Sequence, residues 1–234
     1  RVRGVIAAAL ALVLAAPQQA PSNDVTADFA VPDGLRVTLW AESPQLYNPT
    51  AIDVDAKGRL WVAEAVNYRK WNGRNPGLDH PDGDRIVVLE DTDHDGRFDK
   101  RTVFTDDVQM LASIAIGCGG VWLMTPPQLI FIPDRDGDDK PDGAPIVMLD
   151  GFTPATDNHH TFANGLKWGP DGWLYGRCGA SSPGRPGPPG TPDQDRVPLF
   201  GGIWRYRPDF SLLFPKPAEQ KDSTAYPSKS MKPI

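Results

Sequence analysis

Residues 52–62 read IDVDAKGRLWV, and two later stretches repeat this pattern, 114–123 (IAIGCGGVWL) and 166–175 (LKWGPDGWLY). In each stretch, β-branched and aromatic residues flank a short segment that contains glycine, which is typical of two strands joined by a tight turn. Glycine suits such a turn because it adopts positive φ without steric cost. Each stretch therefore predicts an antiparallel hairpin.

Each hairpin is followed by two further apolar runs, at 86–89 and 101–104, at 129–132 and 146–149, and at 203–206 and 212–214. Four antiparallel strands repeating at about fifty residues, without helical periodicity, are typical of β-propeller blades. We therefore expect an all-β fold, a partial β-propeller of about three blades over 33–214, with a β-sandwich as the alternative. Residues 35–41 are expected to form an outer strand.

Composition agrees with a folded, turn-rich chain and excludes one class of partner. The chain has 23 Gly and 25 Pro among its 234 residues, which indicates many turns. Its net charge is −6, so it lacks the basic excess that neutralises phosphates in nucleic-acid binding. We expect no nucleic-acid partner.

The N-terminal residues follow the order of charged, apolar and small residues that is typical of a secretory signal peptide. Arg1 and Arg3 precede an apolar run at 5–16, and small and polar residues follow it. Residues 1–20 are therefore predicted to be a signal peptide that exports the protein to the periplasm or the cell exterior, with a buried helix as the alternative. The run is too short to span a bilayer, so no transmembrane span is expected.

The C-terminal stretch and the cysteines carry less information. Residues 215–234 are polar and interrupted by proline, so we expect an irregular tail produced by truncation or a change of reading frame. Cys118 and Cys178 are the only cysteines, which excludes a disulfide framework, a cysteine zinc site and covalently attached haem. One disulfide and two free thiols both remain open.

Two acidic turns lie between the expected third and fourth strands of the first two blades. Residues 91–99 (DTDHDGRFD) and 134–142 (DRDGDDKPD) both read D-x-D-x-D-x-x-x-D, a spacing that converges carboxylates on a hard cation such as calcium. Neither is a full EF-hand loop, since Thr102 and Pro145 stand at the twelfth positions and Asp139 stands where glycine is expected in the second. The predicted ligands are Asp91, Asp93, Asp95, Asp99, Asp134, Asp136, Asp138 and Asp142. A solvated acidic hairpin is the alternative.

The opposite end of the predicted blades collects residues suited to catalysis. Glu64 closes a second strand, Arg69 lies in the loop after it, and Arg177 opens another loop. The adjacent His159 and His160 lie in the connection to the third hairpin. Loops on a rigid scaffold often carry function, and histidine can accept a proton from a hydroxyl. Histidines that only hydrogen-bond their own loop are the alternative. A calcium ion in the acidic turns would lie at the far end and be structural.

Several segments together resemble a known family. They are 48–52 (NPTAI), 58–64 (GRLWVAE), 83–93 (GDRIVVLEDTD), the His159–His160 pair and 168–176 (WGPDGWLYG). Over about 33–206 the chain resembles the N-terminal β-propeller of the membrane-bound dehydrogenases of planctomycetes and verrucomicrobia. That family is similar to soluble quinoprotein glucose and sorbosone dehydrogenases.

The resemblance implies a six-bladed propeller that oxidises a sugar or alcohol hydroxyl with pyrroloquinoline quinone (PQQ) and calcium, and passes electrons to a cytochrome c. It implies His160 as general base with His159 as the substitute, Glu64 facing the pocket, and Arg177 and Arg69 beside the cofactor. Most of the quinone pocket is expected in later blades, outside this chain. The alternatives are a calcium-dependent lactone hydrolase and a noncatalytic module that binds carbohydrate or protein.

Overall fold

The computed structural model describes residues 26, 28–67, 80–153, 161–180, 182–209 and 231–233. The chain divides into two compact units, 1–39 and 40–234. The described residues of the first unit form turns and no strand, and all strands of the described chain lie in the second unit. Among the described residues, no helix has the length and apolar character needed to cross a bilayer.

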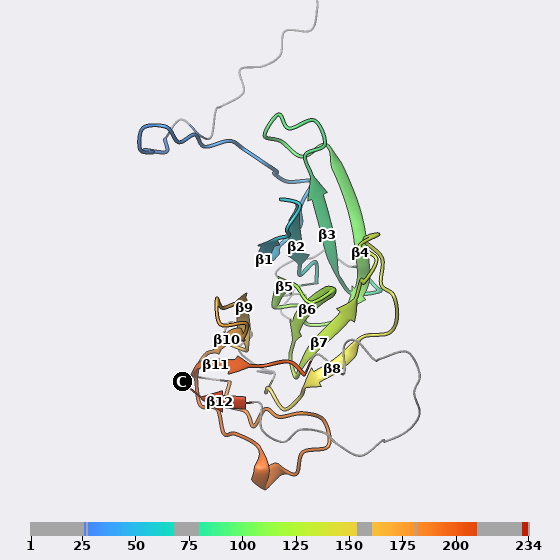
Figure 1. The fold of residues 1–234 in the computed structure, drawn as a ribbon, viewed down its shortest axis with the longest axis vertical. Coiled ribbons are helices and arrows are strands. Elements are labelled where there is room, and N and C mark those ends of the chain that lie inside the picture. The colour runs from blue at the N-terminus through green and yellow to red at the C-terminus, as the bar shows by residue number, and fades with distance from the viewer. Residues whose placement is uncertain are drawn as a thin grey trace, which may run out of the picture. The chain divides into compact units, whose positions relative to one another are not determined.

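Three antiparallel sheets of four strands make up the second unit (Figure 1). The first sheet contains β1 (Pro49–Val54), β2 (Leu60–Glu64), β3 (Asp84–Glu90) and β4 (Lys100–Val108) in that order. The second contains β5 (Ser113–Ile116), β6 (Gly120–Thr125), β7 (Gln128–Pro133) and β8 (Ile146–Leu149). The third contains β9 (Asn164–Trp168), β10 (Leu174–Cys178), β11 (Gly202–Tyr206) and β12 (Met231–Pro233), with the short 3₁₀ helix η2 (Asp193–Asp195) before β11.

The all-β prediction is confirmed, and the three repeated stretches form the β1–β2, β5–β6 and β9–β10 hairpins. Residues 35–41 form no strand. Instead Trp40 and Ala41 pack against Val62 and Val87 on one face of the first sheet. The strand expected at 212–214 lies outside the described residues. Met231–Pro233 pairs with β11 at the fourth position of the third sheet, where an irregular tail was expected.

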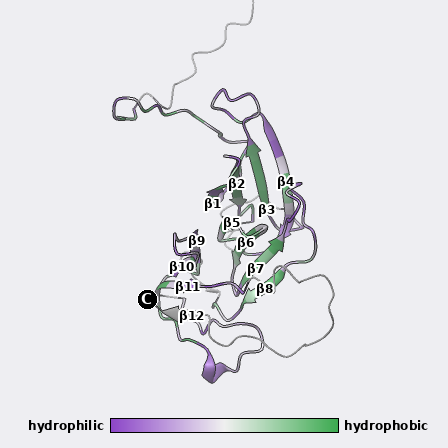
Figure 2. Ribbon diagram, viewed as in Figure 1, coloured by the Kyte–Doolittle hydropathy of each residue, from purple (hydrophilic) through white to green (hydrophobic). Residues whose placement is uncertain are grey.

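Alternation along the strands gives the second sheet two apolar faces. Val121 and Leu123 point to one face and pack with Trp61 of the first sheet. Trp122, on the other face, packs with Trp204 of the third sheet. Figure 2 shows the middle strands β3 and β7 as apolar. The three sheets therefore stack face to face. Each large apolar side chain that is fully buried between them stabilises the fold by roughly 1.5–3 kcal/mol.

The first strands of the three sheets lie side by side. Asp53 of β1 accepts the backbone N–H of Ile116 in β5 at 2.8 Å, and its other oxygen accepts a 2.9 Å hydrogen bond from Nζ of Lys167 in β9. Ser113 Oγ of β5 accepts the backbone N–H of Leu166 in β9 at 3.0 Å. These bonds bring β1, β5 and β9 together and so create the wall of the candidate site.

Candidate functional site

A cavity of about 1060 Å³ extends along the first strands of the sheets. Residues of β1, β5 and β9 line it, together with the segments that enter β3 and β5. Its polar lining residues in the described chain are Thr50, Asn67, His80, Asp84, Gln109, Ser113, Asn164, Lys167 and Arg177. This mixture of an imidazole, a carboxyl group, cations and amides suits a small polar ligand.

His80 is held at the cavity by a pair of hydrogen bonds from one side chain. The N–H of His80 donates to Asn67 Oδ1 at 2.9 Å, and Asn67 Nδ2 donates to the His80 carbonyl at 2.8 Å. Nδ1 of the imidazole is buried and has no hydrogen-bond partner within the described chain. The backbone of His80 is thus fixed at the cavity, while Nδ1 of its ring is a buried nitrogen without a partner in the described chain.

Asp84 supports the same corner of the cavity. It begins β3, is 4% exposed, and accepts the backbone N–H groups of Asn67 at 2.9 Å and Leu111 at 3.0 Å. Burial raises the pKa of Asp84, while the two backbone hydrogen bonds and the nearby His80 oppose that shift. Asp84 is therefore a buried acid beside a histidine, with one backbone donor on each of its oxygens.

Arg177 of β10 lies on the third-sheet side of the cavity. Its Nε donates to Asn164 Oδ1 at 2.7 Å. Gly165 lets the side chain cross β9 closely, because a Cβ at Gly165 would fall 2.8 Å from Arg177 Nε and 3.1 Å from Cγ. Lys167 also lines the cavity, but its ammonium group is paired with Asp53. Arg177 therefore reaches the cavity where the sequence analysis expected it, and its role there remains a prediction.

Glu64 lies outside the cavity lining. Its side chain is fully buried, accepts the backbone N–H of Tyr47 at 2.9 Å, and forms ion pairs with Arg85 and, at 3.3 Å, with Arg101. These partners hold Glu64 inside the first sheet, whereas the neighbouring Ala65 lines the cavity. The other predicted site residues, His159, His160 and Arg69, lie outside the described residues.

The two acidic turns bring carboxylates together as the spacing predicts. One oxygen from each of Asp91, Asp93 and Asp99 lies within 4.8 Å of the others, and Asp134, Asp136 and Asp138 form a matching group. Two of the eight predicted ligands lie outside these groups and accept backbone N–H groups, Asp95 from Arg97 at 2.8 Å and Asp142 from Arg135 at 2.6 Å.

These turns and the cavity lie at opposite ends of the strands. Asp84 begins β3 at the cavity, and Asp91 follows its last residue, Glu90. Seven residues of strand separate the two by roughly 20 Å. An ion at the acidic turn is therefore too distant to contact a ligand in the cavity.

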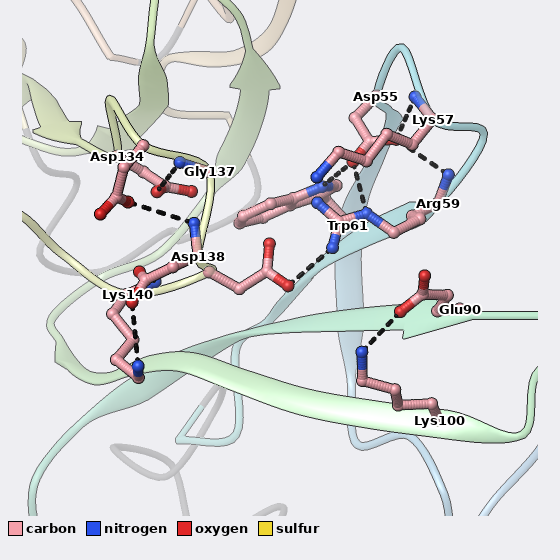
Figure 3. A network of polar contacts seen from close by, with 12 residues as sticks. Asp55, Lys57, Arg59, Trp61, Glu90, Lys100, Asp134, Gly137, Asp138 and Lys140 are labelled. Atoms are coloured by element: carbon pink, nitrogen blue, oxygen red, sulfur yellow. Dashed lines mark hydrogen bonds and ion pairs between the residues drawn. The ribbon is translucent and has the colours of Figure 1, made fainter. Parts of the chain in front are cut away.

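A buried ionic network joins the second acidic turn to the first sheet (Figure 3). Arg59, in the β1–β2 turn, donates to Asp55 at 2.8 Å and to Asp139 at 2.6 Å. Trp61 Nε1 also donates to Asp55 at 3.0 Å. Although burial lowers it, the two carboxylates raise the pKa of Arg59 above its usual range. The network keeps these charges compensated.

Both cysteines are free thiols. Cys178 lies in the core with its Sγ 3.0 Å from the Ser182 carbonyl oxygen, and Cys118 is partly buried in the β5–β6 turn. Burial raises the pKa of both thiols. Burial is the one cause of either shift, so within the described residues no nearby cation makes these thiols reactive.

Sequence reasoning did not identify His80, Asp84, Asn164 or Lys167. His80 is one of only four histidines in the chain, and Asp84 is the second residue of the 83–93 segment, so both carried a weak signal. Their meeting depends on Asn67, which lies 13 residues before His80 and bonds to both residues. That contact follows from tertiary structure and not from local spacing.

Comparison with known proteins supplies a family. No curated protein matches the chain. A family described as a domain of unknown function, DUF7133, matches residues 21–226, which is most of the sequence and includes every cavity residue named above. The chain therefore belongs to the DUF7133 family.

Proposed function

We propose that the three sheets are blades of a β-propeller and that the cavity is the substrate site of an exported oxidoreductase acting on sugar or alcohol hydroxyls. Two arrangements support the propeller: the sheets stack face to face, and their first strands β1, β5 and β9 lie side by side. Blades of a propeller surround a central channel in this way.

The observation that carries the chemistry is the position of His80, which Asn67 clamps at the cavity wall beside Asp84. In the proposed reaction a substrate hydroxyl loses its proton to His80. An acceptor of the quinone class, if bound, would supply the two-electron oxidation that turns the carbon bearing this hydroxyl into a carbonyl carbon. Histidine is the most frequent general base in proteins. Asp84 would stabilise the imidazolium that results.

The described lining does not complete a pocket for PQQ. This cofactor carries three carboxylates, and Arg177 is the one cationic lining residue without an acidic partner in the described chain, since Lys167 is paired with Asp53. No described residue is therefore assigned to the binding of PQQ. Calcium is proposed only for the two acidic turns, where it would offset the repulsion among three nearby carboxylates.

The lactone hydrolase alternative has less support. Such an enzyme needs carboxylates in the cavity to hold a catalytic metal. Asp84 is the one acidic residue among the described residues lining the cavity, and each of its oxygens already accepts a backbone N–H. The carboxylate groups of the acidic turns lie at the other end of β3.

Dye reduction tests the proposal directly. The full chain is supplied with calcium, a dye acceptor and either PQQ or a soluble benzoquinone, which needs no carboxylate-binding pocket. Neutral and acidic sugars and simple alcohols are compared as substrates. We expect His80→Gln to lower the rate about 10²–10⁴-fold, as loss of a general base does. His160→Gln tests the base predicted from the sequence. His94→Asn is the control, because His94 is exposed in the first acidic turn and asparagine tolerates its positive φ of 62°.

Two results would overturn the proposal. No dye reduction with any substrate removes the oxidoreductase function. An undiminished rate in His80→Gln, with a circular dichroism spectrum like that of the parent, removes His80 as the base.

A further inference from the structure

We infer that the cavity recognises the carboxylate of a sugar acid, a uronate or an aldonate, and that Arg177 is the residue that binds it. The inference rests on the proposed function in one respect, that the cavity is a sugar site. It adds the class of sugar and the residue that selects it.

The charge balance of the cavity favours an anion. The whole chain carries a net charge of −6, yet its cavity has two cationic lining residues, Lys167 and Arg177, and one acidic one, Asp84, in the described chain. Asp84 is buried against two backbone N–H donors, and Lys167 is ion-paired with Asp53 at 2.9 Å. Within the described residues Arg177 is therefore the lining cation without an acidic partner, and a concave wall focuses its field on the cavity.

The geometry of Arg177 is fixed before any ligand arrives. Nε is committed to Asn164 Oδ1 at 2.7 Å, and the stem of the side chain passes so close to Gly165 that a Cβ there would fall 3.1 Å from Arg177 Cγ. The terminal nitrogens of the guanidinium have no partner among the described residues, and their fork matches the two oxygens of a carboxylate. Because the side chain is already ordered, less conformational entropy is lost on binding.

A single guanidinium without an acidic partner among the described residues favours a carboxylate over a phosphate. Phosphate carries about two negative charges at neutral pH and is bound by clusters of cations or by helix N-termini, whereas one guanidinium pairs fully with one carboxylate. The described cavity offers one such guanidinium, which favours a carboxylate over a phosphate ester.

The remainder of the lining fits the body of a sugar. Ile52 is 58% exposed although it is a large apolar residue, and it lines the cavity with Phe162 and Leu166. These side chains offer an apolar surface to the C–H face of a pyranose ring. Thr50 and Gln109 supply polar groups for hydroxyls on the same walls.

Isothermal titration of the full chain, without quinone or dye, tests this inference. The probes are glucuronate, galacturonate and gluconate, each compared with glucose and galactose. We expect the acids to bind at least tenfold more tightly than the neutral sugars, with a preference that falls as salt rises. Arg177→Gln should abolish the preference, and Arg177→Lys should retain only part of it because lysine lacks the fork.

Arg207→Gln is the matched control. Arg207 is exposed and directly follows β11 of the third sheet. Its guanidinium lies 6.0 Å from the ring of Trp173, which precedes β10 at the end opposite to Arg177. It should bind like the parent chain. Circular dichroism of each variant shows that loss of binding is not loss of folding.

Each other outcome is decisive. Equal affinity for acids and neutral sugars, or an unchanged preference in Arg177→Gln, overturns the inference. PQQ titrated alone is a further arm: Arg177-dependent binding of PQQ that sugar acids do not displace would assign the carboxylate site to a cofactor and also overturn it. Sugar acids that bind through Arg177 without dye reduction would leave the inference standing and remove the oxidoreductase.

Discussion

Arg59 and Asp139 lie 80 residues apart in the chain and are joined by a 2.6 Å hydrogen bond between the first and second sheets. Asp139 adopts a left-handed conformation with φ of 65°, where glycine is the favoured residue. The backbone of the second acidic turn is thus strained at Asp139, and the carboxylate of this residue pairs with the buried guanidinium of Arg59. Such a pairing links the packing of two sheets to the conformation of a turn.

Arg59→Met should destabilise the protein strongly. The change leaves Asp55 and Asp139 without their cation, and the exposed fractions of the Arg59 and Asp139 side chains are only 9% and 10%. Breaking a buried pair in this way costs about 3–5 kcal/mol. Lys100→Gln is the control, since its pair with Glu90 lies at the surface, where solvent screening leaves such a pair with little effect on stability. Urea unfolding measures both, and equal losses in the two variants would contradict the role given to Arg59.

Stability should fall in acid partly through Asp55. Although burial raises it, hydrogen bonds from Trp61 and Arg59 hold the pKa of Asp55 below its ordinary value. A carboxyl group with a lower pKa in the folded state contributes stability above its unfolded pKa of about 4, and loses that contribution as pH falls through the folded value. The urea midpoint measured from pH 6 to pH 3 should therefore decline less steeply in Asp55→Asn. Parallel curves for the two proteins would count against this.

Gly176→Ala should disturb the core of the third sheet. A Cβ at Gly176 would fall 2.2 Å from the ring of Trp204, which is fully buried. Overpacking of this kind typically costs about 1–3 kcal/mol. Gly143→Ala is the control because a Cβ there meets nothing within 4 Å and its φ is not positive. Thermal unfolding should separate the two variants, and equal melting temperatures would show that the Trp204 ring moves aside freely.

Gly165→Ala should displace Arg177 from the cavity. The new Cβ would lie 2.8 Å from Arg177 Nε, and the φ of +68° adds strain of about 1–2 kcal/mol. Gly172→Ala carries similar strain at φ +76°, with nothing within 4 Å of its Cβ. Both variants should lose comparable stability, but only Gly165→Ala should weaken the binding of sugar acids. Equal binding by the two would contradict the positioning of Arg177 by Gly165.

Calcium should stabilise the folded chain through the two acidic turns. A ligand that binds only the folded state adds about 2.7 kcal/mol at a hundredfold excess over its dissociation constant. We expect a higher melting temperature with calcium than with magnesium, and loss of this rise when Asp93→Asn and Asp136→Asn are combined. Asp106→Asn, an exposed acid of β4, is the control. A melting temperature indifferent to calcium would support the solvated hairpin instead.

The strands were predictable because their signals are local. Alternating apolar residues and a turn glycine lie within about ten residues of each other in every hairpin, and the structure pairs them accordingly. Residues 35–41 show where this fails. Trp40 packs its apolar ring on the face of the first sheet. A local sequence pattern cannot distinguish such packing from the pairing of a strand.

The site was less predictable because its residues meet through distant contacts. Arg177 could be placed at the cavity end because it follows directly from the end of a predicted strand. The same reasoning placed Glu64 at the cavity, but its ion pairs with Arg85 and Arg101 hold the side chain inside the first sheet. His80 depends on a side-chain clamp from Asn67, for which a single sequence gives no signal.

The carboxylate of Asp53 bonds to the backbone of β5 and the side chain of Lys167 in β9 while belonging to β1. One side chain therefore sets the spacing of all three strands along which the ligand would lie. Ligand preference is for that reason a shared property of the sheets. A selection for altered preference should return substitutions in the interfaces between sheets, far from any ligand atom, as readily as substitutions in the cavity wall.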